Sequence, residues 1–435
     1  MAPHQTALVL HRVFILTALS VITQSRKRRF YQRPLNTRRA KLGHHRNLIQ
    51  ELWDEDDSFF RLDRNTFNHL LNAIGDRLSH APTHRQPISP DERLSMTLGF
   101  LASGASQKLI ALDWRVGRST LHSILKETCQ AIWDTFKDDV VPFPTTPQEW
   151  KKISEEFKAK TQFPNCLGAI DGKHVKLQAP PLAGSTYYNY KHFHSLNLMA
   201  VCDANLCFTF VDIGSPGRNS DGGVFAQTAL GAALSDTDVV KTLSLPPDQY
   251  FDGCGENRRT LPHVFVADEA FPLRRHIMRP FPGQNLTERQ EVYNYRLCRA
   301  RRLIENAFGV LTQRWRFLRG DLIAFPENAV LYVQAAIVLH NWLRKNSVKS
   351  YCPPKYVDHV GINGEIINGE WRDEAARMPS GSSSCLQNID KRHMASNNHT
   401  ESAVEIRESY ADFFISPNGE VEWQHRHVRR GRDNP

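Results

Sequence analysis

The chain has 435 residues, 40% of them hydrophobic, which is enough for two or three packed domains of a soluble globular protein. The formal net charge of +9 is local, because the window from Arg26 to Gln50 holds nine Lys or Arg and no acid. The eight cysteines contain no Cys-x-x-Cys pair, which excludes a zinc module of that kind and indicates reduced intracellular thiols.

Residues 1–46 are predicted to form a basic N-terminal arm. Clustered cations favour a polyanion such as DNA, because each neutralised phosphate releases counterions. The run Arg26–Arg29 also fits a nuclear import signal, which predicts a nuclear protein, or a cytoplasmic one in the absence of a partner. A solvated tail is the alternative interpretation of this arm.

The apolar run Val13–Ile22 precedes the basic cluster. Its ten residues are too few to span a bilayer, so no membrane association is expected. The run nevertheless resembles the apolar part of a signal peptide, and a targeting role for residues 7–25 stays open.

Residues 47–150 are predicted to form an α-helical domain, because apolar residues recur at steps of three and four from Leu48 to Ile74. Further along, two short helices flank a turn at residues 113–117. This arrangement fits a helix-turn-helix whose second helix enters a major groove, with an ordinary helical hairpin as the alternative. The second helix would begin with the candidate DNA contacts Arg118, Ser119 and Thr120.

Residues 151–346 are predicted to form an α/β domain with a mixed sheet and flanking helices. An Arg-rich helix is expected over 287–319 and a last apolar helix over 328–343. Short β-type runs occur at Cys166–Ile170, Val175–Leu177, Leu196–Cys202, Cys207–Ile213 and His263–Ala267.

Residues 347–435 are polar and irregular, and we expect a largely disordered C-terminal tail. One apolar piece within it, Glu405–Trp423, could dock on another part of the molecule.

Three carboxylates in the α/β domain are candidates for phosphodiester chemistry. Asp171 and Asp268 are each expected to end a strand, and Glu305 lies on the Arg-rich helix. Carboxylates gathered at one sheet edge repel one another unless divalent cations lie between them, and hard oxygen ligands select Mg²⁺ or Mn²⁺. Two such ions can hold the attacking and leaving oxygens of a phosphodiester displacement.

Each of these carboxylates also has a structural interpretation. A lone Asp at a strand end is usually a loop cap, and Glu305 could pair with Arg301 or Arg302 on its own helix. Asp212 and Asp221 compete with Asp268 for the position of the second carboxylate.

Several basic residues near the carboxylates could contact DNA phosphates. Lys173 and His174 follow Asp171 directly, but strand alternation lets only one of them face the same way as the carboxylate. A solvated polar loop or helix face is the alternative for the whole set. The candidates are Lys173, Lys191, His192, Arg301 and Arg302.

Several separated motifs resemble those of the PIF/Harbinger transposases and the host nucleases derived from them, and they occur in the family's order. The resemblance runs from about Arg26 to Asn346. The motifs are Arg118–Thr120, Gly168–Val175, Tyr188–Ser195, Pro216–Asp221, Ala267–Leu273, Tyr293–Arg296, Arg301–Gly309 and Leu339–Trp342. One departs from the family, because Ala267–Phe271 stands where many members have Gly-Asp-x-Gly-Tyr.

The resemblance implies an RNase H-like DDE catalytic domain behind a helix-turn-helix-like domain. Asp171, Asp268 and Glu305 would be the catalytic and metal-binding triad, holding two Mg²⁺ or Mn²⁺ ions. The enzyme would cut DNA at transposon ends and transfer the freed 3′-hydroxyls to target DNA, together with a separately encoded Myb/SANT-like DNA-binding protein and as a homo-oligomer. The alternatives are a domesticated DNA-binding or scaffolding protein without cleavage, and a hydrolase of RNA or small phosphoesters.

Overall fold

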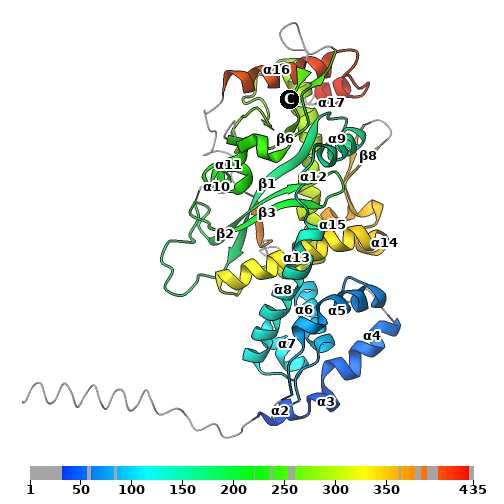
Figure 1. The fold of residues 1–435 in the computed structure, drawn as a ribbon, viewed down its shortest axis with the longest axis vertical. Coiled ribbons are helices and arrows are strands. Elements are labelled where there is room, and N and C mark those ends of the chain that lie inside the picture. The colour runs from blue at the N-terminus through cyan, green and yellow to red at the C-terminus, as the bar shows by residue number, and fades with distance from the viewer. Residues whose placement is uncertain are drawn as a thin grey trace, which may run out of the picture.

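The computed structural model describes residues 32–55, 60–82, 86–219, 221–235, 239–252, 260–361, 364–377, 384–388 and 400–430. The predicted import signal Arg26–Arg29 and the apolar run Val13–Ile22 lie outside these ranges. Within them, no helix combines the length and the apolar character needed to cross a membrane. Figure 1 shows a helical region at one end of the molecule and an α/β region built around one long strand.

The helical region contains short helices near its start and four longer ones. Asp63 caps one of the long helices by accepting a hydrogen bond from the Thr66 amide at 2.7 Å, and Gly104, with φ of 68°, ends the next in the left-handed conformation. The helices are α2 (Pro34–Thr37), α3 (Arg39–Leu42), a π-helical turn (His45–Ile49), α4 (Gln50–Glu55), α5 (Arg64–Leu78), α6 (Pro90–Ser103), α7 (Gln107–Asp113) and α8 (Arg118–Val140).

The α/β region is a mixed sheet in the order β3-β2-β1-β6-β7, with β10 as a second partner of β1. β1, β2 and β3 are antiparallel neighbours, whereas β1, β6 and β7 are parallel. The predicted mixed sheet is therefore confirmed. The strands are β1 (Cys166–Leu177), β2 (His194–Cys202), β3 (Phe208–Pro216), β6 (Val264–Val266), β7 (Ile277–Met278) and β10 (Leu386–Asn388). Two small ribbons, β4 (Gln249–Tyr250) with β5 (Thr260–Leu261) and β8 (His359–Val360) with β9 (Ile366–Ile367), lie outside it.

Helices cover both faces of the sheet. The larger core lies on the face of the sheet covered by α12 and α13 and continues into the helical region, and a smaller core lies on the other face beneath α10 and α11. A capping box of Thr146 and Glu149 begins α9, which packs on β1. The helices are α9 (Pro147–Thr161), α10 (Asp221–Gln227), α11 (Ala229–Ser235), α12 (Glu288–Arg314) and α13 (Pro326–Asn346), with 3₁₀ turns at Val239–Leu243 and Arg316–Arg319.

One strand prediction needs correction. The runs Cys166–Ile170 and Val175–Leu177 belong to a single strand, so Asp171 lies in the middle of β1 and does not end it. The polar residues that interrupt the apolar pattern are buried, and β2 pairs with them continuously from Ala169 to Leu177. Tertiary pairing thus overrides the local sequence pattern.

The prediction of a largely disordered tail after residue 346 is wrong for the part of it that the structure describes. β10 pairs with Lys173–Val175 of β1, and α15, α16 and α17 pack on α12. The apolar face of α16 includes the fully buried Tyr410 and Phe414. The elements are α14 (Val348–Tyr351), a 3₁₀ turn (Pro354–Tyr356), α15 (Glu370–Ala376), α16 (Glu401–Ile415) and α17 (Gln424–Arg430), with the strands given above.

Candidate active site

Two of the three predicted carboxylates lie at equivalent positions along adjacent parallel segments, Asp171 within β1 and Asp268 just beyond the end of β6. The last paired residues of β1 and β6 are Ala169 and Val266, and Asp171 and Asp268 each follow two residues later. Parallel strands lie about 4.8 Å apart, and residues two apart share a face, so the two aspartates are neighbours on one face of the sheet. Both are buried, at 6% and 7% exposure.

Asp171 also lies at a break in the pairing along one edge of β1. β6 pairs with β1 as far as Ala169, and β10 pairs with the same strand from Lys173 onward. The other edge of β1 is continuous, with Asp171 opposite Ala200 of β2. The chain therefore holds Asp171 on a fixed backbone while leaving one side of it free of a strand partner within the described residues.

Glu305 comes to these aspartates from α12, which packs on β1. Its Oε1 lies 2.5 Å from Nη2 of Arg301, one turn earlier on the same helix. Burial lowers the pKa of Arg301, but the charges of Glu305, Asp171 and Asp268 outweigh burial and raise this pKa above its usual value. All three carboxylates therefore act electrostatically on one guanidinium, which is the clearest sign that they converge.

Lys173 supplies a second buried cation. Its Nζ lies 2.8 Å from Asp171 Oδ2, and it also lies over the ring of Phe308 at 5.3 Å from the centroid. His174 faces the other way, as alternation predicts, with Nδ1 at 3.1 Å from Ser195 Oγ. Burial and the charge of Lys191 lower the pKa of His174 to about 4, so this imidazole is neutral near pH 7. Lys173 is thus the one of the pair that joins the carboxylates.

The two alternative carboxylates do not join this group. Asp212 on β3 is paired with Met199, which in turn is paired with Gly172, so it lies on the opposite face of the sheet from Asp171. Burial raises the pKa of Asp212, and no other charge contributes to this shift. Asp221 begins α10, and its side chain lies outside the described part of the structure.

The candidate DNA contacts fall in separate places. Lys191 and His192 lie in the connection between β1 and β2, where His194 is paired with Leu177 at the far end of β1. Arg302 points away from Glu305 and pairs with Asp358 at 3.4 Å. The helix-turn-helix candidates are exposed in the first turn of α8, after a connection at residues 114–117 that follows α7; these are Arg118, Ser119 and Thr120.

The donor set has the chemistry that a hard divalent cation requires, because three carboxylates converge where positive charge already stands. Within the described ranges, however, no three Asp, Glu, His or Cys side chains are grouped closely enough to hold one ion. Asp171 is engaged with Lys173, and Glu305 with Arg301. An ion bound here would therefore take over the counter-charge that these two side chains supply.

Two of the motifs that carried the resemblance contain residues whose hydrogen bonds join separate elements of the fold. In the motif Leu339–Trp342, Asn341 Nδ2 donates to the carbonyls of Val140 and Phe208 at 2.9 and 2.7 Å, which ties α13 to both α8 and β3. Its neighbour His340 hydrogen-bonds the Leu206 carbonyl with Nε2 at 2.9 Å, and burial lowers its pKa to about 3.

In the motif Tyr293–Arg296, the guanidinium of Arg296 is buried against the C-terminal helices. Nη1 donates to the Gly419 carbonyl at 3.1 Å and to Gln424 Oε1 at 2.9 Å, and Nη2 donates to the Gln162 carbonyl. The sequence pattern identified the motif but missed this role. Gln424 lies in the tail that was expected to be largely disordered, and Gly419 lies in the piece Glu405–Trp423, for which docking was considered without a docking site.

The chain matches known proteins over this same region. Residues 170–341 match the sequence model of the family described as "DDE superfamily endonuclease". This match begins one residue before Asp171, includes Asp268 and Glu305, and ends at Asn341 within the motif Leu339–Trp342. The α/β region, with its mixed sheet and flanking helices, is therefore a DDE superfamily endonuclease domain.

Similar full-length proteins narrow the class further. A Homo sapiens protein named "Putative nuclease HARBI1" is 25% identical over 289 residues, which cover 65% of this chain and 76% of that protein. An Arabidopsis thaliana protein named "Protein ALP1-like" is 24% identical over 293 residues, covering 66% and 69%. The chain is thus homologous to Harbinger transposase-derived nucleases, and the predicted resemblance is confirmed. No solved structure was found to match it.

Proposed function

We propose that this chain is a divalent-metal-dependent DNA endonuclease of the RNase H-like type, working as a transposase or as a nuclease derived from one. The observation that carries the proposal is that Asp171 and Asp268 hold equivalent positions next to one another in the sheet, while α12, which packs on β1, carries Glu305 and its partner Arg301. Two buried aspartates with a partly exposed glutamate nearby are costly to bring together, and a phosphodiester site with bound cations would account for that cost.

Asp171, Asp268 and Glu305 are the residues that would hold Mg²⁺ or Mn²⁺, with two ions expected. When bound, these ions would acidify the attacking water and neutralise charge on the phosphate. The protein's own contribution is placement: the continuous pairing with β2 fixes Asp171, and a hydrogen bond from the Ala270 amide to Oδ1, at 2.9 Å, fixes Asp268. Glu305 is held by the packing of α12 on β1.

DNA binding would involve surfaces outside the carboxylate group as well as the two cations within it. The exposed first turn of α8 and the loop carrying Lys191 and His192 are the candidate phosphate contacts, together with Lys173, Arg301 and the basic arm. We propose further that the chain works in the nucleus, as a homo-oligomer, with a Myb/SANT-like DNA-binding protein. If the chain works as a transposase, it would also transfer the freed 3′-hydroxyls to target DNA.

The test is cleavage of DNA that carries the terminal repeats flanking the coding locus, with Mg²⁺ and with the partner protein present. Asp171→Asn, Asp268→Asn and Glu305→Gln should each lower the rate at least about 100-fold, because each removes several kcal/mol of transition-state stabilisation. Asp212→Asn is the matched control, since it removes a partly buried carboxylate from the opposite sheet face, and it should cleave at the wild-type rate.

The outcomes separate the candidate functions. Equal rates for the wild type and the three carboxylate variants would contradict an enzyme built on these residues. Salt-dependent DNA binding without cleavage by the wild type, in the presence of the partner, would indicate the DNA-binding or scaffolding role instead. Cleavage of RNA in preference to DNA would indicate the third candidate.

A further inference from the structure

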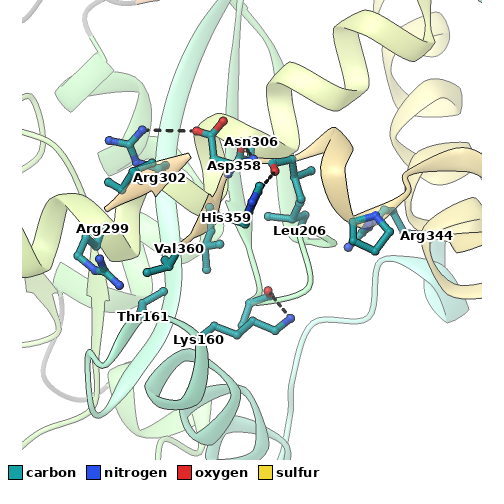
Figure 2. A pocket seen from close by; sticks show the side chains of 15 residues that line it. Lys160, Thr161, Leu206, Arg299, Arg302, Asn306, Arg344, Asp358, His359 and Val360 are labelled. Carbon is teal, nitrogen blue, oxygen red and sulfur yellow. Dashed lines mark hydrogen bonds and ion pairs between the residues drawn. The ribbon is translucent and has the colours of Figure 1, made fainter. Parts of the chain in front are cut away.

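A pocket of about 350 Å³ lies between α9, α12, the β2–β3 turn and the ribbon of β8 and β9 (Figure 2). It is separate from the carboxylate group, because it uses the side of α12 that carries Arg299, Arg302 and Leu303. One wall of the pocket, which includes Val357, Val360 and Ile366, belongs to the C-terminal segment. The function proposed above does not involve this pocket. The volume lies within the range of about 300–1,000 Å³ that is typical of ligand sites.

The interior of the pocket is aliphatic. Leu206, Leu303, Val357, Val360 and Ile366 line it, and the ring of His359 is the one aromatic group among its described lining residues. Val360 is 45% exposed, which is high for a valine on a strand, so part of this apolar surface already faces solvent. An aliphatic interior suits aliphatic side chains better than nucleobases, which stack on aromatic rings.

Cations surround this apolar interior. Figure 2 shows Arg299 and Arg302 on one side of the pocket, Arg344 on the other, and Lys160 between them. Lys160 Nζ donates to the Ala204 carbonyl at 2.8 Å, which is an uncharged acceptor.

The two outer arginines are also bonded to uncharged groups. Arg344 Nη2 donates to the Asn205 carbonyl at 2.7 Å, and Arg299 Nη1 to the Gly364 carbonyl at 2.9 Å. Within the described residues, none of Lys160, Arg299 and Arg344 forms an ion pair. Their positive charge is therefore held in place by the backbone without being directly neutralised.

Acidic residues near the pocket do not balance these cations. Asp358 is shared between Arg302, at 3.4 Å, and Arg372, at 2.6 Å. Asp203 and Glu156 lie close enough to Lys160 to act on its charge. Among the described residues that line the pocket, four cations meet one carboxylate, Asp358, so the rim keeps a positive excess that is complementary to an acidic ligand.

We propose that this pocket binds a segment of a partner protein in which acidic residues alternate with aliphatic ones. A cavity of about 150 Å³ holds one benzene-sized group, so this pocket has room for two aliphatic side chains. The flanking carboxylates of the segment would meet Lys160 and Arg344 at the rim. The proposal does not depend on nuclease activity.

The probe is a short fluorescein-labelled peptide in which Glu and Leu alternate, titrated with the full-length protein while fluorescence anisotropy is recorded. Saturable binding is expected, and Val360→Asp and Lys160→Ala should each weaken it at least about tenfold. Matched controls are Ile323→Asp, which changes an aliphatic residue that is 70% exposed outside the pocket, and Lys152→Ala, on the exposed side of α9. Both controls should bind like the wild type, as should Glu305→Gln.

Two control peptides separate the two parts of the recognition, one with Ser in place of Leu and one with Lys in place of Glu. Each should bind at least about tenfold more weakly than the probe. The proposal is overturned if the wild type does not bind the probe, if the Ser peptide binds equally well, or if Val360→Asp and Lys160→Ala have no effect. Single-stranded DNA is a competing ligand. If it displaces the probe from the wild type and does not bind Val360→Asp, the pocket binds nucleic acid and the proposal is overturned.

Discussion

Arg301 and Glu305 form an ion pair one turn apart on α12, with 2.5 Å between Nη2 and Oε1. The cation precedes the anion along the helix, which is the less favourable order for an i,i+4 pair. Local helix stability therefore does not explain why this arginine is here. The charges of Asp171 and Asp268 also act on this guanidinium, which explains the presence of an arginine at position 301.

Replacing Arg301 with Met should make stability depend on divalent metal. Without Mg²⁺ the variant leaves three carboxylates without their shared counter-charge, and we expect a loss of about 2 kcal/mol in the free energy of unfolding, allowing for the partial exposure of Glu305. Added Mg²⁺ should restore most of this loss. Urea unfolding with and without Mg²⁺ measures both quantities.

The control for this prediction is Arg275→Met, which breaks an ion pair with Asp248 that includes none of the three carboxylates. Its effect on stability should be the same with and without Mg²⁺. If Mg²⁺ fails to rescue Arg301→Met, the carboxylates do not bind the ion in the way we propose.

Cys298 offers a way to locate bound metal without measuring activity. It is the exposed thiol among the described cysteines, and it lies two turns before Glu305 on α12, about 10 Å along the helix axis. With Cys254 replaced by Ser, a nitroxide on Cys298 should lose signal amplitude saturably as Mn²⁺ is added. Asp171→Asn together with Glu305→Gln should abolish this broadening.

The matching control moves the label to the first turn of α8 by combining Ser119→Cys with Cys298→Ser. This distant nitroxide should be insensitive to Mn²⁺ at the same concentrations. Equal broadening at the two positions would mean that Mn²⁺ binds nonspecifically.

Removing the C-terminal helices should destabilise the whole domain. A chain ending at residue 399 lacks α16 and α17, so the buried Arg296 loses the Gly419 carbonyl and Gln424 as acceptors. The main loss comes from the apolar surface that α16 covers, because exposing it to water costs about 25 cal/mol for each Å². Circular dichroism during heating should show a transition that is much lower or absent.

A chain ending at residue 430 is the control, since it keeps α17 and should unfold like the full-length protein. If the chain ending at 399 also unfolds at the wild-type temperature, the contacts between α12 and the C-terminal helices do not contribute to stability.

His340 should make the protein sensitive to mild acid. Its pKa is about 3 in the folded state, where burial disfavours the charged form, against about 6.5 when unfolded. Because the folded pKa is depressed, the unfolded state binds the extra proton between these values. Stability from this group is therefore complete above about pH 6.5 and falls as the pH drops toward 3, by up to about 1.4 kcal/mol per pH unit.

Urea unfolding of the wild type and His340→Gln at pH 7 and pH 5 measures this contribution. The variant should lose less stability between the two pH values, even if it is less stable at both. Identical pH dependence would show that other buried histidines, such as His263, account for the acid sensitivity.

Residue type and order were enough to predict the mixed sheet and to nominate Asp171, Asp268 and Glu305. They were not enough to choose between Asp268 and Asp212, because that choice depends on strand register. Only the pairing of Met199 with both Gly172 and Asp212 shows that Asp212 lies on the other face.

The C-terminal segment shows a different limit of sequence patterns. β10 is a strand of three residues with no alternation to mark it, and its partner Val175 is far away in the sequence. The packing of α16 and α17 on α12 is likewise long-range, so a polar composition was mistaken for disorder. Such segments are ordered by contacts that no local window of sequence contains.

The pairing of β10 with β1 also orders events during synthesis. A ribosome makes β1 more than 200 residues before β10, and the edge of β1 at Lys173–Val175 cannot pair with β10 until Leu386–Asn388 has left the exit tunnel. The basic N-terminal arm is exposed to the cell for most of that time. A nascent chain can therefore meet polyanions well before the sheet around Asp171 is complete.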